Sequence, residues 1–260
     1  MSMSSYLEQA VIDHLLRNMA YTYPAAGVWA GILSEVSDDG STYTEFSGGN
    51  YVRKVIPPAD FGAASNGAIT NANDIVWTAA TTDWGTATHI ALFDAQFAGN
   101  MLYWGTLSVP KFIAQSAVLT IKAGELDATL AGAFSLYSRN GILDLTLGDQ
   151  AFASPAAIYV GLGTVPSSLN ASLTEPVGIG YTRVLATSWT TGDAGVLSVA
   201  TPTITFRANG NDWGDITHVG LFDQQAGGNL LFALALNATR YIADGDGIVF
   251  DPDTIVVRVD

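Results

Sequence analysis

The chain lacks cysteine and is poor in basic residues, and both absences narrow what it can be. With no cysteine among its 260 residues, it can form neither disulfides nor thiolate metal sites. Only 10 residues are Lys or Arg against 24 Asp and Glu, which gives a formal net charge of −14. So few cations cannot build a basic face that neutralises a phosphate backbone. We therefore expect no direct binding of nucleic acid.

Long hydrophobic runs are also missing. No stretch approaches the roughly 18 to 20 apolar residues that a membrane-spanning helix needs, and the N-terminal Met-Ser-Met-Ser-Ser lacks the features of a signal peptide. We expect a protein made in the cytoplasm that has no contact with a membrane. Charged residues make up only 13% of the chain and hydrophobic ones 48%, with 27 glycines. This balance is typical of compact, turn-rich β domains.

One stretch occurs twice, at residues 83–100 and 212–229. The two copies share 11 of 18 aligned positions at a constant offset of 129, where unrelated sequences would share roughly one. A repeat of about half the chain predicts two similar domains, residues 1–131 and 132–260. The shared residues include Trp84, Gly85, His89, Phe93, Asp94 and Asn100 in the first copy, and Trp213, Gly214, His218, Phe222, Asp223 and Asn229 in the second.

The repeated motif predicts a strand followed by a hairpin loop. Its side chains alternate along residues 88–93, and both faces carry apolar groups, so the strand should be covered on both sides. The loop 94–100 closes on Gly-Asn, which supplies the positive φ that such turns need. Further short strands separated by turn clusters occur in each copy. The sequence therefore predicts an all-β fold of two tandem β-sandwich or jelly-roll-like domains.

An amphipathic helix is predicted at the N-terminus, over residues 5–19. Ser5 and Glu8 have the spacing of a capping box, in which both side chains satisfy free backbone N–H groups of the first turn. Apolar residues then recur at helical spacing. The helix must be covered by its own β domain or by a neighbouring subunit, and we favour packing within the chain.

The corresponding segment of the second copy, residues 136–147, looks unlike a helix. Gly141 interrupts it, Gly148 follows it, and glycine disfavours helical structure. We expect a strand or an irregular turn there.

His89 and Asp94, together with their counterparts His218 and Asp223, are the obvious candidates for catalysis or metal binding. Residues five apart on one strand point to opposite faces, so the two side chains should diverge. A zinc site also needs three or four ligands, and the remaining histidine, His14, has no counterpart in the second copy. We interpret them as a hydrogen-bonded structural histidine and a turn-forming aspartate. The sequence predicts no catalytic residue, metal site or cofactor.

The aromatic residues allow two interpretations. Trp84 and Trp213 could stack on sugars or fill the core, and their identity in both copies favours the core, because a binding platform is free to diverge after duplication. Tyr23, Tyr43 and Tyr51 are the predicted exposed aromatic contacts.

Three segments, residues 6–18, 48–53 and 83–103, resemble the small tailed-phage proteins known as tail fibre or minor tail proteins. The second copy matches from Glu175 onward and departs from that pattern in its missing helix. The resemblance implies a non-enzymatic structural protein of the virion, made in the host cytoplasm, whose partners are other virion proteins. It transfers no catalytic residue.

Several functions remain open within this resemblance. We favour a tail fibre or baseplate-associated component that mediates assembly or host attachment, and we expect a homo-oligomer, with a trimer favoured. Capsid decoration, as a cement or head-fibre protein, is the alternative on the particle. A carbohydrate-binding module that recognises a host surface glycan is the alternative of another class. A polysaccharide hydrolase would need a convergent set of carboxylates that the sequence does not supply.

Overall fold

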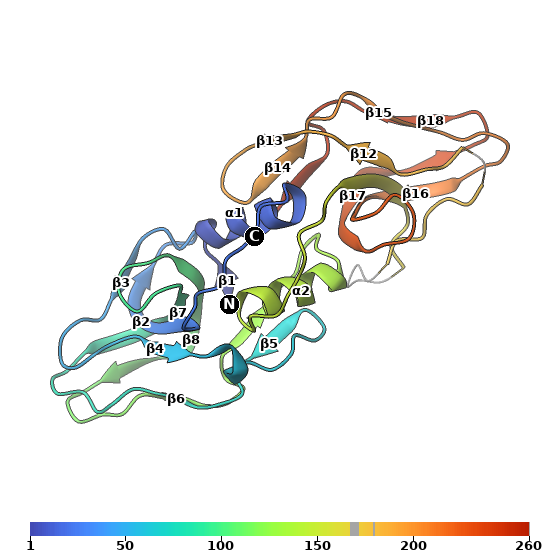
Figure 1. Ribbon diagram of the computed structural model, residues 1–260. Helices are drawn as coiled ribbons and strands as arrows, with labels where there is room; N and C mark the ends of the chain where they lie inside the picture. The colour runs from blue at the N-terminus through green and yellow to red at the C-terminus, as the bar shows by residue number, and fades with distance from the viewer. Residues whose placement is uncertain (167–171, 179, 260) are drawn as a thin grey trace.

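The computed structural model describes residues 1–166, 172–178 and 180–259. The molecule is elongated, with the first copy of the repeat (repeat 1, residues 1–131) at one end and the second copy (repeat 2, residues 132–260) at the other (Figure 1). Two helices lie between them. Repeat 1 contains β1 (Ser2–Met3), α1 (Ser5–Leu16), β2 (Val28–Val36), β3 (Tyr43–Glu45), β4 (Lys54–Ile56), the 3-10 helix η1 (Pro58–Asp60), β5 (Ala68–Thr70), β6 (Ile75–Val76), β7 (Gly85–Phe93), β8 (Met101–Ile113), β9 (Thr120–Ile121) and β10 (Asp127–Thr129).

Repeat 2 follows the same plan from its own helix onward. Its elements are α2 (Leu136–Thr146), β11 (Ile158–Gly163), β12 (Val184–Ala186), β13 (Trp189–Thr191), β14 (Val196–Val199), β15 (Ile204–Arg207), β16 (Gly214–Phe222), β17 (Leu230–Ile242), β18 (Gly247–Phe250) and β19 (Val256–Arg258). The all-β class with an N-terminal amphipathic helix is confirmed.

The main sheet of each repeat is built around the strand of the repeated motif. In repeat 1 its order is β1-β8-β7-β2-β3, with β4 also on β2, and in repeat 2 it is β12-β11-β16-β17. The β7–β8 pair has a register shift between Ala87 and His89, and the β16–β17 pair has one between Ile216 and His218. The two repeats therefore share not only residues of the motif but also the position of an irregularity in strand pairing.

Smaller sheets complete both repeats. β5 pairs with β10 and β6 with β9 in repeat 1, while β14 pairs with β13 and β19, and β15 with β18, in repeat 2. Most buried residues of both repeats belong to one continuous hydrophobic core that includes Trp77, Leu143 and Phe232, and a small separate cluster surrounds Phe93 in repeat 1 and Phe222 in repeat 2. The division into two domains after residue 131 stays a prediction. No helix in the described ranges is long and apolar enough to cross a membrane.

Helix α1 begins at the predicted residue, Ser5, and ends three residues earlier than predicted. Ser4, not Ser5, is the N-cap, and its hydroxyl accepts from the N–H of Leu7. At the other end Asn18 adopts a left-handed conformation with φ 54°, and the N–H of Met19 donates to the carbonyl of Asp13. A residue in the left-handed conformation directly after the C-cap, here Arg17, is a common end of a helix, so the predicted last turn does not form.

Repeat 2 also begins with a helix, so the expectation of a strand or irregular turn at residues 136–147 is wrong. Ser135 caps α2 as Ser4 caps α1, and Asp149 ends it with φ 50°. The misleading residue, Gly141, has a packing role. A Cβ atom at this position would lie 2.5 Å from ring carbons of Phe152, so glycine is needed for the ring to approach the helix.

Both helices pack within the chain and lie between the two repeats. α1 contacts β1 and β8 of its own repeat and also β14 of repeat 2. α2 contacts β17 of its own repeat and also β5 of repeat 1. Each helix therefore covers its own sheet and bridges to the other repeat, as Figure 1 shows at the centre of the molecule.

Candidate functional site

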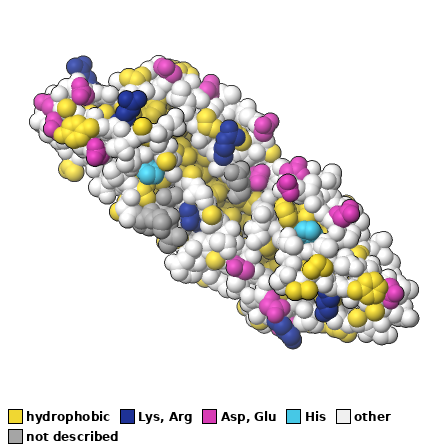
Figure 2. All heavy atoms as spheres, turned by 180° about the vertical axis from the view of Figure 1, so that it is seen from behind, with side chains coloured by type: hydrophobic (Ala, Val, Ile, Leu, Met, Phe, Trp, Pro, Cys, Tyr) yellow, Lys and Arg dark blue, Asp and Glu magenta, His cyan; other side chains and the backbone are white. Residues whose placement is uncertain are grey.

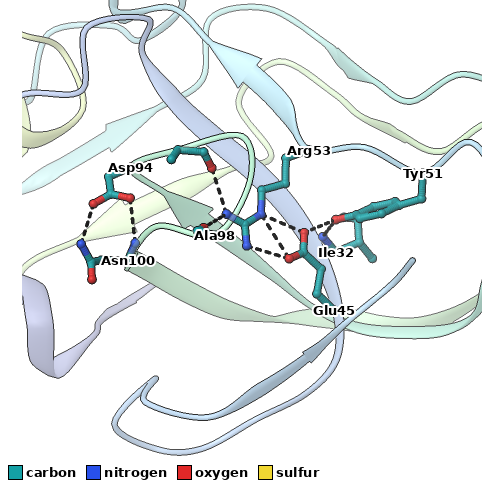
Figure 3. A network of polar contacts seen from close by, with 8 residues as sticks. Ile32, Glu45, Tyr51, Arg53, Asp94, Ala98 and Asn100 are labelled. Carbon is teal, nitrogen blue, oxygen red and sulfur yellow. Dashed lines mark hydrogen bonds and ion pairs between the residues drawn. The ribbon is translucent and has the colours of Figure 1, made fainter. Parts of the chain in front are cut away.

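The loop of the repeated motif is tied by its own side chains. In repeat 1, Asp94 Oδ1 accepts from the N–H of Asn100 at 2.7 Å, and Asp94 Oδ2 accepts from Asn100 Nδ2 at 2.8 Å (Figure 3). Asp223 and Asn229 make the same two contacts in repeat 2, at 2.6 and 2.7 Å. The aspartate thus closes the hairpin through the backbone and leaves neither oxygen directed at a histidine.

A buried arginine holds the same loop from beneath. Arg53 Nη1 donates to the carbonyls of Ala95 and Ala98 at 2.9 and 2.6 Å, inside the loop (Figure 3). Its Nε and Nη2 donate to the carboxylate of Glu45, with Nη2 at 2.7 Å. The guanidinium carbon also lies 3.4 Å from the centroid of the Phe93 ring. With a side chain only 5% exposed, Arg53 ties the loop to the sheet through ionic, hydrogen-bond and cation–π contacts.

Tyr51 completes this network from the side of the sheet. Its hydroxyl donates to Glu45 Oε1 at 2.8 Å and accepts from the N–H of Ile32 at 2.7 Å. Burial, and then the negative charge of Glu45, raise the pKa of this hydroxyl well above its usual value. The phenol therefore stays protonated and acts as a fixed donor.

Repeat 2 contains the same network in residues displaced by about 130 positions. Arg183 donates to Glu175 and to the loop carbonyls of Gln224 and Gly227, the latter two at 2.8 and 2.6 Å. Its guanidinium carbon lies 3.4 Å from the centroid of the Phe222 ring. Two copies with the same partners indicate that the network holds the loop in shape and is common to both halves of the molecule.

The motif's tryptophans and glycines lie behind this network. Trp84 and Trp213 are buried, at 8% and 9% exposure. Trp84 packs edge-on against Tyr51, and Trp213 packs edge-on against Tyr181, the matching tyrosine of repeat 2. Trp84 Nε1 donates to the carbonyl of Gly49 at 2.9 Å. Gly85 and Gly214 have positive φ, 108° and 76°, at the start of their strands.

The two motif histidines have neighbouring threonines as partners. His89 Nδ1 lies 2.7 Å from Thr88 Oγ1, and His218 Nδ1 lies 2.7 Å from Thr217 Oγ1. Burial lowers the pKa of His218. In the described part of the chain, neither ring is hydrogen-bonded to the aspartate of its motif. Among the described residues, no group of three or more His, Asp or Glu could hold a metal ion.

Two of the three predicted contact tyrosines are not exposed contacts. Tyr51 is half-buried in the arginine network, and Tyr23 is half-buried with its hydroxyl donating to the carbonyl of Leu147. Both side chains satisfy backbone groups and pack on the core, so the expectation that they are exposed is wrong, while a role in contacts stays a prediction for them. Tyr43 is exposed and rests on the ring of Phe93, with centroids 5.3 Å apart. Its role as a contact stays a prediction.

Phe97 is an exposed residue of the loop that the sequence alone did not identify. Its side chain is 72% exposed at the loop tip, where repeat 2 has Ala226. A hollow of about 240 Å³ lies beside it, lined by both polar and apolar side chains, including Phe46, Gln96 and Val52. The sequence does contain one indication of this residue, because the aromatic side chain is present in only one of the two closely matched loops. A residue that the shared fold does not require in both repeats can be exposed on the surface.

The rest of the surface offers little for polyanion binding. Figure 2 shows Asp and Glu side chains dispersed over both ends of one face, with Lys and Arg only as isolated groups. Three of the ten basic residues are buried: Arg53, Arg139 and Arg183.

The family comparison matches both halves of the chain. The model of the podophage GP4 fiber I protein gp80 family matches residues 2–129 and again residues 133–258. The chain belongs to this family. The resemblance to tailed-phage fibre proteins is thereby confirmed, with one family unit in each repeat. No curated protein matches the chain.

Family membership makes this a structural phage protein. A fibre protein is associated with the virion and contacts other virion proteins, and membership of a structural family is consistent with the absence of a predicted catalytic residue. The arginine networks fit this class, because they use charged side chains to fix loops and not to react.

Proposed function

We propose that the protein is a fibre component on the tail or baseplate of the particle, where it mediates assembly or host attachment. The observation that carries this proposal is the fibre-family match over both repeats. The rigid hairpin loops support it, since a fibre element must present contact residues without a large loss of conformational freedom on binding.

The loop of repeat 1 is the contact element in this proposal. Phe97 projects from a loop that is fixed from one side by Asp94 and from below by Arg53. An exposed aromatic on a rigid support is the type of residue that dominates protein interfaces once it is buried by a partner. The matching loop of repeat 2 has Ala226 and glycines instead, so the two repeats should differ in their contacts.

A host surface glycan is the second candidate for what this loop binds. The observation that favours it is the hollow beside Phe97, because a sugar ring stacks on an aromatic face while polar neighbours take its hydroxyls. Given the net charge of −14, a neutral glycan fits better than an anionic one. The homo-oligomer, with a trimer favoured, remains part of the proposal. Capsid decoration remains the alternative location.

The deciding experiment localises the protein in intact particles by labelled antibody or by electron microscopy. Label on the tail or baseplate is the expected result. Label confined to the head would replace the fibre proposal with capsid decoration, and particles without any label would refute a role in the virion.

The role of the loop is tested with particles that carry Phe97→Ala. We expect either less protein per particle, if the loop binds a virion protein, or normal incorporation with slower adsorption, if it binds the host. Val109→Ala is the matched control, because Val109 is also 72% exposed but lies in β8, outside the loop. Equal incorporation and adsorption in both variants would contradict the assigned role of Phe97.

A further inference from the structure

The contacts between the repeats have the pattern of a symmetric dimer. α1 reaches β14, and α2 reaches β5. β5 and β14 occupy matching places in the two repeats, since each directly follows a glycine with positive φ, Gly67 at 77° and Gly195 at 73°. In a two-fold interface, a patch on one partner contacts the same patch on the other, so every contact occurs twice.

The two glycines show that the reciprocity holds at the level of single residues. A Cβ atom on Gly67 would lie 2.9 Å from Arg139 Cδ in α2, and one on Gly195 would lie 2.9 Å from Glu8 Cβ in α1. Glu8 and Arg139 hold the same position in their helices, four residues after the capping serine. Each helix therefore approaches the other repeat at the same place, although Arg139 Cβ would lie 3.4 Å from a Cβ on Gly67 and Glu8 Cβ 2.9 Å from one on Gly195.

The start of each helix is anchored in its own repeat in the same way. Ser4 donates its hydroxyl to the carbonyl of Met101, and Ser135 donates its hydroxyl to the carbonyl of Leu230. The strand residue just before each cap also has a matching partner, because Met3 pairs with Tyr103 as Phe134 bridges to Phe232. The start of α1 is thus attached to β8 in the same way as the start of α2 is attached to β17.

Three polar contacts across the interface occur on one side without a counterpart among the described residues of the other side. Tyr103, buried in β8, donates its hydroxyl to Thr146 Oγ1 at 2.8 Å, whereas the matching residue in repeat 2 is Phe232. The backbone N–H of Gly67 donates to Asn140 Oδ1 at 2.8 Å, and that of Ala64 donates to Asp144 Oδ1 at 2.7 Å. A symmetric framework with one-sided polar contacts is what divergence of two linked copies would produce.

From these contacts we infer that the chain is a dimer of two family units joined covalently, whose halves bind each other through a self-sufficient interface. The partner of each repeat's helix face is the other repeat, and residues 131–133 link the two repeats. This inference goes beyond the proposed function and holds wherever the protein sits on the particle.

The test cuts the link in the full-length protein. A specific protease site is inserted after Ala131, an exposed residue between β10 and α2, and the folded protein is then cleaved. We expect the two fragments to remain together as a 1:1 complex in native mass spectrometry, with an unchanged circular dichroism spectrum. Fragments that separate, unfold or aggregate after cleavage would overturn the inference.

Glycine substitutions in the cleaved protein test the reciprocity. Gly67→Ala and Gly195→Ala should each raise the dissociation constant of the two fragments about tenfold, since each places a Cβ atom against the opposite helix. Gly124→Ala is the control, because Gly124 has a similar φ of 79° and no atom within 4 Å of a Cβ position. If Gly67→Ala or Gly195→Ala changes the dissociation constant no more than this control does, the proposed interface is wrong.

Discussion

In each repeat, one ion pair between an arginine and a glutamate holds the hairpin loop of the repeated motif in its conformation. Arg53 and Glu45 are largely removed from water, with 5% and 18% of their side chains exposed, and their geometry is that of a multiple charge-assisted contact. Desolvation makes such a pair costly to assemble and costly to break, because the remaining charge is left without a partner. The main effect of the pair is therefore to select one loop conformation, and its net contribution to stability is the smaller effect.

Removing this arginine tests that view. We expect Arg53→Met to lower the free energy of unfolding by about 3 kcal/mol, since it removes the arginine donor from two loop carbonyls and leaves the Glu45 carboxylate without its cation. Urea denaturation measures the change. Arg17→Met is the control: Arg17 is 39% exposed in its ion pair with Asp13, so its loss should cost less than about 1 kcal/mol. Similar losses in the two variants would refute the structural role of Arg53.

His14 makes the stability of the protein depend on pH. The ring is buried in α1, its Nδ1 accepts from the N–H of Tyr21, and its Nε2 therefore donates to the carbonyl of Phe152 across the repeats. Burial lowers the pKa of His14 below its usual value of 6.5. Below about pH 6.5 the unfolded chain consequently binds a proton that the folded chain rejects, so stability falls as pH falls.

Thermal unfolding between pH 7 and pH 5 checks this. We expect the midpoint of the wild type to fall over this range by more than that of His14→Gln, which has no group titrating there at position 14. The native form needs a neutral ring, because a proton on Nδ1 would remove the acceptor for Tyr21. An equal fall in both proteins would show that His14 does not contribute.

At the scale of elements, the duplicated strand and hairpin were predictable and the second helix was not. Period-two alternation and the Gly-Asn turn identify β7 and its loop directly. Gly141 suggested the wrong structure, because propensity takes no account of Phe152, a residue eleven positions away whose ring requires the missing Cβ. The helix is stabilised by its serine cap and by tertiary packing, neither of which a local scale measures.

The packing role of Gly141 gives a prediction with an unusual sign. Alanine is favoured over glycine within a helix by about 1 kcal/mol, yet Gly141→Ala should destabilise the protein by about 1 to 3 kcal/mol, because the new methyl group meets the Phe152 ring. Chemical denaturation of Gly141→Ala, Phe152→Leu and the double variant gives the coupling. We expect the double variant to be more stable than the sum of the single changes; additive losses would contradict the contact.

The arginine network was only partly visible in the sequence. Tyr51 and Arg53 recur as Tyr181 and Arg183, which marks them as shared, but Tyr51 looks like a loop residue. What identifies the network is the glutamate eight residues before each arginine. Its contact is formed in repeat 1 when β3 pairs with β2, and in repeat 2 beside the bridge between Thr164 and Thr174. Strand pairing of this kind is set by the whole sheet and cannot be inferred from spacing alone.

At the scale of the whole molecule, a connection from the end of repeat 2 back to the start of repeat 1 should be equivalent to the existing connection between the repeats. Residues 131–133 join Leu130 to Phe134, and if residue 260 were joined to residue 1, three residues would likewise separate Val259 from Met3. Leu130 and Val259 close matching parts of the two repeats, as do Phe134 and Met3 at the start.

A circular permutant therefore needs no added linker. We expect a chain that begins at Gly132, runs through residue 260 directly into Met1 and ends at Ala131 to fold with a melting temperature within a few degrees of the wild type. Circular dichroism and thermal unfolding measure this. As a control, a permutant opened inside β7 should not fold, because β7 pairs on both sides with β2 and β8. A permutant opened at residue 131 that fails to fold would contradict the two-fold relation.

The short connection at residues 131–133 also has a consequence for how the two repeats associate. Two separate units would meet by a second-order reaction, and their complex would dissociate on dilution. Joined by a few residues, they meet at an effective concentration in the millimolar range, whatever the concentration of the protein. The folded molecule should therefore survive dilution from a crowded cell into the open medium, where an unlinked pair of the same affinity would come apart.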